Sequence, residues 1–285
     1  MSRYLWLLAL PFAAFMASCG SANEGEEGNW ATAPTITLPD SLPVLDSIPK
    51  PSELAGYAWT NAEKALKEQN CEAEACSEIS WHWFALNPEA NQRLHDSVQA
   101  FSWYYLTGIN GVGEQDLDSI GARFFRESKK DVPVGEEIRG WSEENSVWPA
   151  AATKQTFTVG GWVFFFNGGA HGNYASHLEN FDIATGSHLS LNNIVAEPYN
   201  LYALGEQIFR KQKGIAEGMN LSDAGFTFKE DIFYLPETFG VFPEGLLFIY
   251  APYEVASYAE GEQYLLIPYG LFADQLTTSY QYLAK

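Results

Sequence analysis

The residues best suited to chemistry or recognition form the run Gly168-Gly169-Ala170-His171-Gly172, which surrounds one imidazole with three glycines. Glycine adopts backbone angles that other residues resist, so the run predicts a loop that displays His171. An imidazole can serve as a general base, a metal ligand or a hydrogen-bonding contact. The elements around the loop, and any partner group for the ring, therefore decide its function.

A hydrolase would pair His171 with a carboxylate, for which Asp182 and Glu254 are the candidates. A serine triad from Ser176, His177 and Asp182 is disfavoured, because neighbouring residues of a strand point to opposite faces. The sequence also lacks a nucleophile elbow, a Walker loop, an H-E-x-x-H motif and a dinucleotide-binding glycine motif. We therefore expect a protein without catalytic residues, and the His171–carboxylate hydrolase remains as an alternative.

Metal and cofactor sites are not expected either. His171 and His177 stand six residues apart across a glycine-rich turn, and no ligand spacing fixes them. The glycine run lacks the lysine that a phosphate-binding loop would use. Cys71 and Cys76 have no further Cys or His nearby, which makes them a poor zinc site. In an exported chain such a pair predicts a disulfide.

A second candidate contact lies at Pro252-Tyr253-Glu254, which follows the apolar strand-like stretch 246–249. Aromatic rings beside a proline at the end of a strand form a rigid, amphipathic surface. Together with the glycine-rich loop, this segment would supply contacts and charge to one binding surface. The alternative is a tyrosine-rich turn that packs on its own domain.

The start of the chain has the features of an export signal. Arg3 precedes an apolar stretch over residues 4–17, which is too short for a comfortable bilayer span and typical of a signal peptide. Met16-Ala17-Ser18-Cys19 resembles a bacterial lipobox, with Met16 in place of the usual Leu. We expect residues 1–18 to be removed and Cys19 to carry palmitate-type acyl chains. This predicts a lipoprotein anchored to a bacterial membrane, on its periplasmic or outer-surface face; an ordinary secretory signal is the alternative.

Acidic residues dominate the charge of the chain. The formal net charge is −20 at pH 7, and removal of residues 1–18 would make it −21. Such a chain repels nucleic acid and attracts basic partners over long distances. Residues 19–53 combine early acids with recurring prolines, a composition that cannot form a core of its own. We expect this segment to be an extended tether.

The remaining chain alternates between helical and strand-like patterns. Residues 77–85 predict a strand, and Asn87-Pro88 predicts the start of a helix that ends at Gly108. Gly160-Gly161 between two apolar runs predicts a two-residue hairpin turn. Because no regular strand–helix–strand alternation appears, the sequence predicts an α+β fold with antiparallel sheets packed against helices. We expect two small subdomains, residues 54–135 and 136–285.

Several of these motifs together resemble a known family. The run 167–172, Asn180-Phe181-Asp182, Pro252-Tyr253-Glu254, Tyr258-Ala259 and Ile267-Pro268-Tyr269 are similar to the C-terminal domain of RsiV-type proteins. This domain occurs in lysozyme-sensing anti-sigma factors, in some peptidoglycan deacetylases and in stand-alone envelope lipoproteins. The resemblance extends over roughly residues 77–276.

The resemblance implies a binding module that works outside the cytoplasmic membrane. The sequence shows no sigma-binding segment and no deacetylase domain, so neither of those activities is implied. In the lysozyme sensors the domain grips lysozyme, a basic protein, and the acidic charge of this chain is complementary. The expected partner is therefore a lysozyme-like muramidase. Two alternatives remain: a domain that binds peptidoglycan or another glycan through its many aromatic residues, and the hydrolase described above.

Overall fold

The computed structural model describes residues 37–69, 71, 75–88, 91–107, 116–130 and 140–285. Its larger sheet contains five strands in the order β1-β2-β3-β4-β5. These strands are β1 (Trp59–Lys67), β2 (Glu78–Leu86), β3 (Ser142–Ala152), β4 (Thr156–Phe166) and β5 (Asn173–Asp182). β2 and β3 are parallel, and all other neighbours are antiparallel.

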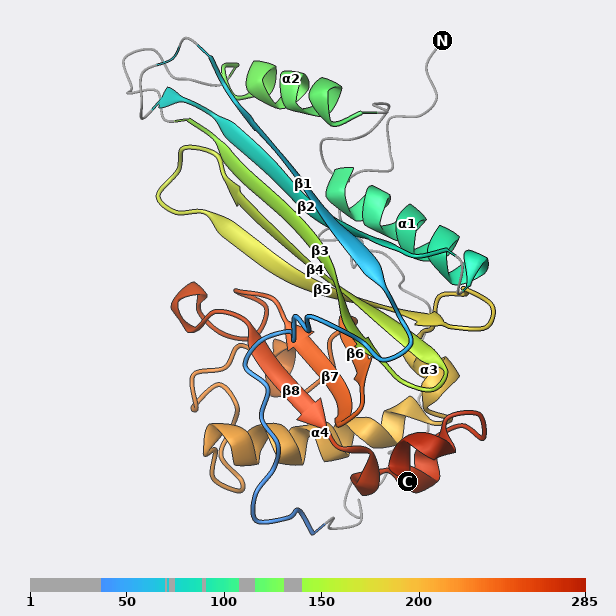
Figure 1. Ribbon diagram of the computed structural model, residues 1–285. Coiled ribbons are helices and arrows are strands. Elements are labelled where there is room, and N and C mark those ends of the chain that lie inside the picture. Colours follow the sequence, from blue (N-terminus) through green and yellow to red (C-terminus); the bar gives the residue numbers. More distant parts are fainter. Residues whose placement is uncertain (1–36, 70, 72–74, 89–90, 108–115, 131–139) are drawn as a thin grey trace, which may run out of the picture. The chain divides into compact units, whose positions relative to one another are not determined.

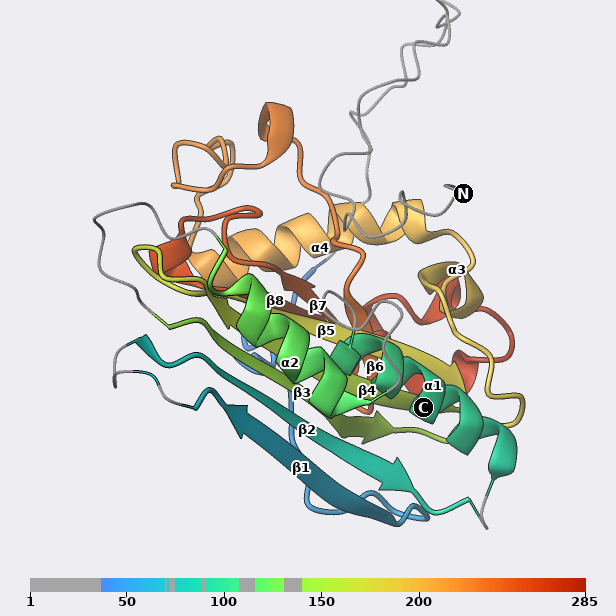
Figure 2. The same ribbon diagram turned by 90° about the horizontal axis from the view of Figure 1, so that it is seen from above.

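Two helices, α1 (Gln92–Thr107) and α2 (Leu117–Glu127), lie between β2 and β3 in the chain and contact one face of the sheet (Figures 1 and 2). Parallel neighbouring strands need such a crossover, because the chain must return to the end of the sheet where the first strand began, and a tight turn cannot span that distance. Leu94 and Val98 of α1 are almost fully buried there. The indole N–H of Trp81 donates to the Leu106 carbonyl at 3.1 Å, so this buried ring keeps its hydrogen bond.

Gly160 and Gly161 lie inside β4, so the predicted hairpin between them is wrong. A Cβ on Gly160 would stand 2.7 Å from the ring of Trp148, and one on Gly161 would stand 2.7 Å from the ring of Tyr105. The two glycines therefore make room for aromatic rings that pack against the strand. Their neighbours in space, rather than a turn, explain why no side chain stands there.

The smaller sheet is antiparallel and consists of β6 (Phe239–Phe242), β7 (Gly245–Tyr250) and β8 (Gln263–Ile267). Its first strand contacts β3, β4 and β5, and α4 (Pro198–Lys213) contacts β8 (Figure 1). A cluster of buried apolar side chains is shared by β3, β5 and the smaller sheet. Its members in these strands are Ala150, Ala151, Leu178, Phe242, Leu247, Ile249 and Leu266.

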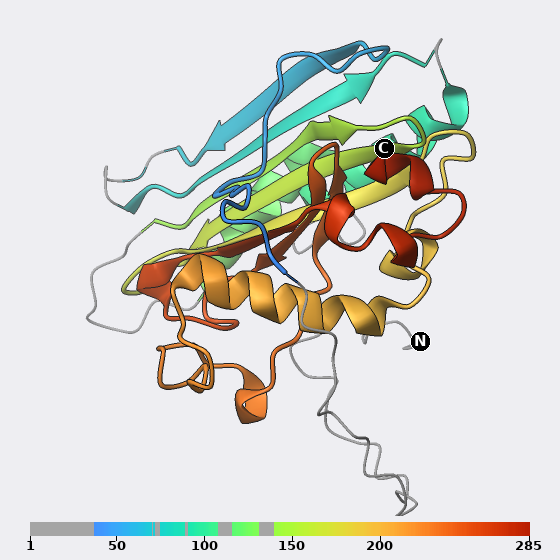
Figure 3. The same cartoon turned by 90° about the horizontal axis from the view of Figure 1, so that it is seen from below.

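Residues 37–53, the described part of the expected tether, pack against the rest of the protein. Ile48 is only 7% exposed and belongs to the same buried cluster. Trp148 Nε1 donates to the Pro49 carbonyl at 2.9 Å, and Lys50 Nζ lies 4.0 Å from the centroid of the Trp148 ring. Figure 3 shows this segment in blue as it runs toward β1. The part of the predicted extended tether over residues 37–53 is therefore docked on the body, and residues 19–36 lie outside the described part.

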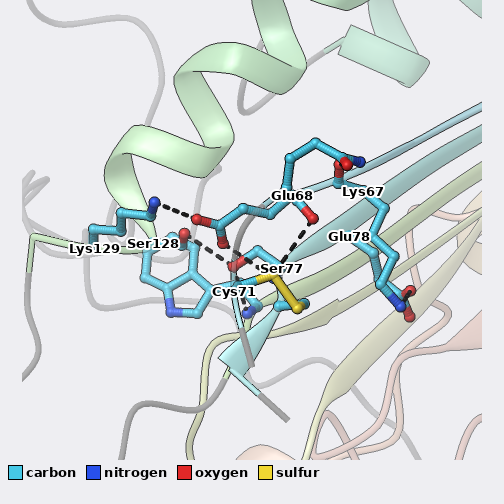
Figure 4. Close-up of a disulfide and its surroundings, with 10 residues drawn as sticks. Lys67, Glu68, Cys71, Ser77, Glu78, Ser128 and Lys129 are labelled. Atoms are coloured by element: carbon cyan, nitrogen blue, oxygen red, sulfur yellow. Dashed lines mark hydrogen bonds and ion pairs between the residues drawn. A yellow bond between two sulfur atoms is a disulfide. The ribbon is translucent and has the colours of Figure 1, made fainter. Parts of the chain in front are cut away.

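The connection between β1 and β2 contains the disulfide Cys71–Cys76, as the cysteine pair predicts. Beside it, the buried carboxylate of Glu68 forms an ion pair with Lys129 just after α2 (Figure 4). The other oxygen of Glu68 accepts from the Ser77 backbone N–H at 3.3 Å. These contacts attach the β1–β2 connection to the end of α2.

The α+β prediction is confirmed, with mostly antiparallel sheets and helices packed on them. The expected boundary between residues 135 and 136 lies outside the described residues. However, β1 and β2 from before it share one sheet with β3, β4 and β5 from after it, and residues 37–285 form one compact unit. Within the described parts of that unit, no helix has both the length and the apolar character needed to cross a bilayer.

Candidate functional site

The glycine-rich run is the connection between β4 and β5, and it exposes His171 as predicted from its composition. Gly168 has a φ of +85°, a conformation that favours glycine. A Cβ on Gly172 would stand 2.4 Å from the ring of Phe164. Gly169 and Ala170 are exposed and have more room. The loop is thus shaped by two glycines for two different reasons.

The second predicted segment, Pro252-Tyr253-Glu254, forms the turn that follows β7. Tyr253 has a φ of +69° and is 58% exposed. The left-handed conformation costs a non-glycine residue about 1–2 kcal/mol, so the surrounding contacts must hold it. Pro252 beside it is half-buried.

Glu254 supplies those contacts instead of pointing to solvent. Its Oε2 accepts from the Ala251 backbone N–H at 2.8 Å, and its Oε1 accepts from the Tyr234 hydroxyl at 3.0 Å. Burial raises the pKa of the Glu254 carboxyl above its usual range. Glu254 was expected to offer charge to a partner, but its geometry shows that it anchors the turn that projects Tyr253.

The two segments meet, although about 80 residues separate them in sequence. The ring of His171 stacks on Tyr258 with centroids 4.2 Å apart, and Tyr258 stacks on Tyr253 at 5.4 Å. The Tyr258 hydroxyl donates to the Gly172 carbonyl at 2.6 Å, and Tyr253 Oη lies 3.4 Å from His171 Nε2. We refer to His171, Gly172, Tyr174, Tyr253 and Tyr258 as the His171–Tyr253 surface.

Glu262 binds the strand that carries Tyr174, and no pattern in the sequence indicated that role. One carboxylate oxygen accepts from the Ser176 backbone N–H, and the other accepts from the Ser176 hydroxyl at 2.9 Å. The Tyr264 hydroxyl donates to the same carboxylate. Tyr174, whose ring meets Tyr258 edge-on at 6.0 Å, lies two residues before Ser176 on β5. Through Glu262, which immediately precedes β8, and Tyr264 within it, β8 is thus linked to Ser176 of β5, two residues from Tyr174.

The His171–carboxylate pair of a hydrolase is not formed among the described residues. His171 Nδ1 lies 2.9 Å from the Gly172 carbonyl, and its contacts at Nε2 and on the ring face are tyrosines. Glu254 is engaged by its own turn, and Asp182 accepts from Thr185 at the opposite end of β5. The contacts of His171 are thus the Gly172 carbonyl and the rings of Tyr253 and Tyr258.

The remaining predicted chemistry is placed as follows. His177 is paired with Glu179 at 2.9 Å, not with Ser176 or Asp182. In the described ranges, no group of three or more His, Cys, Asp or Glu side chains is arranged to hold a metal ion. The expected lipidation residue, Cys19, lies outside those ranges.

Comparison with known proteins relates the chain to one family. Residues 192–270 match the model of a family described as "Protein of unknown function (DUF3298)". The matched segment contains α4, the smaller sheet and the Tyr253 turn, but it does not reach the glycine-rich loop. No curated protein matches the chain.

Two solved structures of that family share the fold. A DUF3298 family member from Bacteroides fragilis NCTC 9343 aligns with a TM-score of 0.64 and 18% identity, over 78% of this chain and 94% of its own. A DUF3298 family protein from Pseudomonas aeruginosa PAO1 aligns with a TM-score of 0.62 and 15% identity, over 79% and 96%. At these identities the likeness shows the fold alone. The chain thus has the DUF3298 fold and contains a segment that matches the family.

Proposed function

We propose that this protein is a non-enzymatic binding module of the bacterial cell envelope, and that its His171–Tyr253 surface docks on a basic protein. The partner we favour is a lysozyme-like muramidase, which is what the resemblance to RsiV-type domains implies. The match over residues 192–270 supports a relationship to the DUF3298 family, whose function is unknown, and does not by itself point to RsiV-type proteins.

One observation carries the proposal: two distant segments of the chain meet to expose a stacked group of aromatic rings. Tyr253 is held in a backbone conformation that tyrosine rarely adopts, and more than half of its surface remains open to solvent. A strained and exposed aromatic residue adds nothing to a core, and such residues are enriched at functional surfaces. Tyrosine is also among the residues that contribute most to protein–protein binding.

Charge around the surface favours a basic partner. Of the three glutamates in the segment 252–263, Glu260 is exposed, whereas Glu254 and Glu262 are held by hydrogen bonds within the protein. The segment itself contains neither Lys nor Arg, and Lys213 reaches it only at Gln263, to which it donates at 2.6 Å. The chain as a whole carries a formal charge of −20, so its long-range field attracts cationic proteins. Complementary charge of this kind raises the rate of association and makes binding sensitive to salt.

Membrane attachment would follow from the predicted signal peptide and Cys19. Because residues 37–53 pack on the body, only residues 19–36 would remain as a tether between the lipid and the domain. Fully extended, these 18 residues span at most about 60 Å. The tether would thus hold the binding module close to its membrane.

The test is isothermal titration of the purified protein with hen lysozyme at low and at high salt. We expect binding at low salt that weakens as salt rises, and loss of binding in His171→Ala and Tyr253→Ala. Tyr104→Ala is the matched control, since Tyr104 is 67% exposed on α1. Absence of binding at low salt would end the lysozyme version of the proposal. Sedimentation with purified peptidoglycan in the absence of lysozyme binding would favour the glycan alternative.

A further inference from the structure

A cavity of about 640 Å³ lies beside β5, away from the His171–Tyr253 surface. Four parts of the chain line it: β5, residues 188–192, the first turns of α4, and residues 235–239. Its size is in the range of pockets that hold small molecules. Tyr174 of that surface and His177 of the cavity are three residues apart on β5, which corresponds to about 10 Å. At this odd spacing their side chains point to opposite faces of the strand, so the cavity is a separate site.

The cavity contains a carboxylate fixed between two imidazoles. Glu179 Oε2 lies 2.9 Å from His177 Nε2, and Glu179 Oε1 lies 2.6 Å from His188 Nε2. The His177 ring stacks on Phe101 and Tyr105 of α1, with centroids 5.7 and 5.8 Å apart. The side chain of Glu179 is only 15% exposed, whereas that of His188 is 62% exposed. The group thus combines a largely buried carboxylate with one accessible imidazole.

An exposed aromatic ring and further polar groups face the same space. Tyr202 of α4 lines the cavity, is 37% exposed, and meets Tyr199 edge-on at 6.0 Å. Asn192 and Glu237 also line it. Together these side chains offer one aromatic ring face, hydrogen-bond donors and hydrogen-bond acceptors.

These features select the class of ligand. Anions are disfavoured, because Glu179 and Glu237 line the cavity and its described lining contains neither Lys nor Arg. A wholly apolar ligand would leave the polar groups without partners, which is costly. A neutral molecule with many hydroxyls and an apolar ring face would satisfy both the ring and the polar groups. We propose that this cavity binds a neutral saccharide.

In this arrangement the apolar face of a sugar ring stacks on Tyr202. Its hydroxyls donate to Glu237 and exchange hydrogen bonds with His188 and Asn192. Glu179 acts through His188, whose ring orientation it fixes. The saccharide site does not depend on the protein-binding surface proposed above, so either can fail without the other.

The test measures binding of three trisaccharides to the full-length protein by titration calorimetry: tri-N-acetylchitotriose, maltotriose and cellotriose. We expect at least one to bind at millimolar or lower concentration, and we expect Tyr202→Ala to weaken it about tenfold. Glu179→Gln should weaken it as well, while Tyr104→Ala on α1 should leave it unchanged. The urea midpoint of each variant is measured in parallel, so that loss of binding is read only from variants that remain folded.

Two results would overturn the proposal. One is the absence of binding heat with all three sugars at millimolar concentration. The other is binding that Tyr202→Ala leaves at full strength, which would place the sugar elsewhere on the protein.

Discussion

Substitution of Gly172 by alanine tests how the glycine-rich loop is built. A Cβ at this position would stand 2.4 Å from the ring of Phe164, whereas an ordinary carbon contact needs at least 3.4 Å. The ring must therefore move by about 1 Å, and overpacking of this kind costs about 1–3 kcal/mol. The Gly172 carbonyl also accepts from Tyr258, so the shift would disturb the stack under His171.

The two neighbouring glycines provide graded controls. Gly168 has a φ of +85°, so alanine there costs about 1–2 kcal/mol, less the gain of about 0.4–1 kcal/mol from a stiffer unfolded chain. A Cβ on Gly169 would meet nothing closer than 3.6 Å, so alanine there should only stabilise the protein, through the stiffer unfolded chain. The expected order of stability is Gly169→Ala highest, then Gly168→Ala, then Gly172→Ala.

Urea unfolding of the three variants measures this order. With a slope of about 2 kcal/mol/M, Gly172→Ala should lower the midpoint by about 1 M, and Gly169→Ala should not lower it. Gly172→Ala should also lose the binding partner, while Gly169→Ala keeps it. If Gly169→Ala destabilised the protein as much as Gly172→Ala, the reasoning from these contacts would be refuted.

Three further predictions concern the packed segment, the disulfide and the buried acid. Ile48→Ala should lower the free energy of unfolding by about 2–5 kcal/mol in urea, because Ile48 is only 7% exposed. Val44→Ala is the control and should cost almost nothing, because Val44 is 66% exposed. Equal effects of the two substitutions would mean that the segment is not docked. Replacing Cys71 and Cys76 by serine should cost about 2 kcal/mol by the loop-entropy relation, measured by the same method, and no loss would show that the bridge closes a loop already ordered without it. Glu254→Gln should change the pH dependence of stability: because burial raises the folded-state pKa of Glu254, the wild-type contribution is full below the usual value of 4.5 and is lost as pH rises through the folded pKa. Urea unfolding of both proteins at pH 5 and at pH 7 measures this change. The difference in unfolding free energy between wild type and Glu254→Gln should not be the same at the two pH values, and an equal difference would contradict the pKa shift.

Local patterns predicted much of the fold. The helix predicted after the strand 77–85 is present as α1, because its apolar spacing acts within the element itself. Its predicted start at Asn87-Pro88 is wrong: α1 begins at Gln92, and the Leu94 backbone N–H donates to Asn91 Oδ1 at 3.1 Å, so Asn91 caps the helix. The strand predicted over residues 77–85 is β2. The glycine-rich loop and the Tyr253 turn could also be identified from residue types alone.

Long-range contacts explain what the sequence did not reveal. β1 is largely exposed and rich in Ala, Glu and Lys, which do not favour strands, and its pairing with β2 decides its conformation. Gly160-Gly161 has the composition of a turn, but the rings of Trp148 and Tyr105 require glycine inside a strand. The anchoring roles of Glu254 and Glu262 likewise depend on partners that lie far away or across a turn. Acidic residues are too numerous in this chain for such a partner to be chosen from sequence.

Hydrogen–deuterium exchange of the protein, alone and with hen lysozyme at low salt, tests the central claim most directly. Docking on the His171–Tyr253 surface predicts slower exchange in residues 168–174 and 252–258 together, with little change in β1 or α1. Protection confined to one of these segments, protection elsewhere, or none at saturating lysozyme would contradict the account.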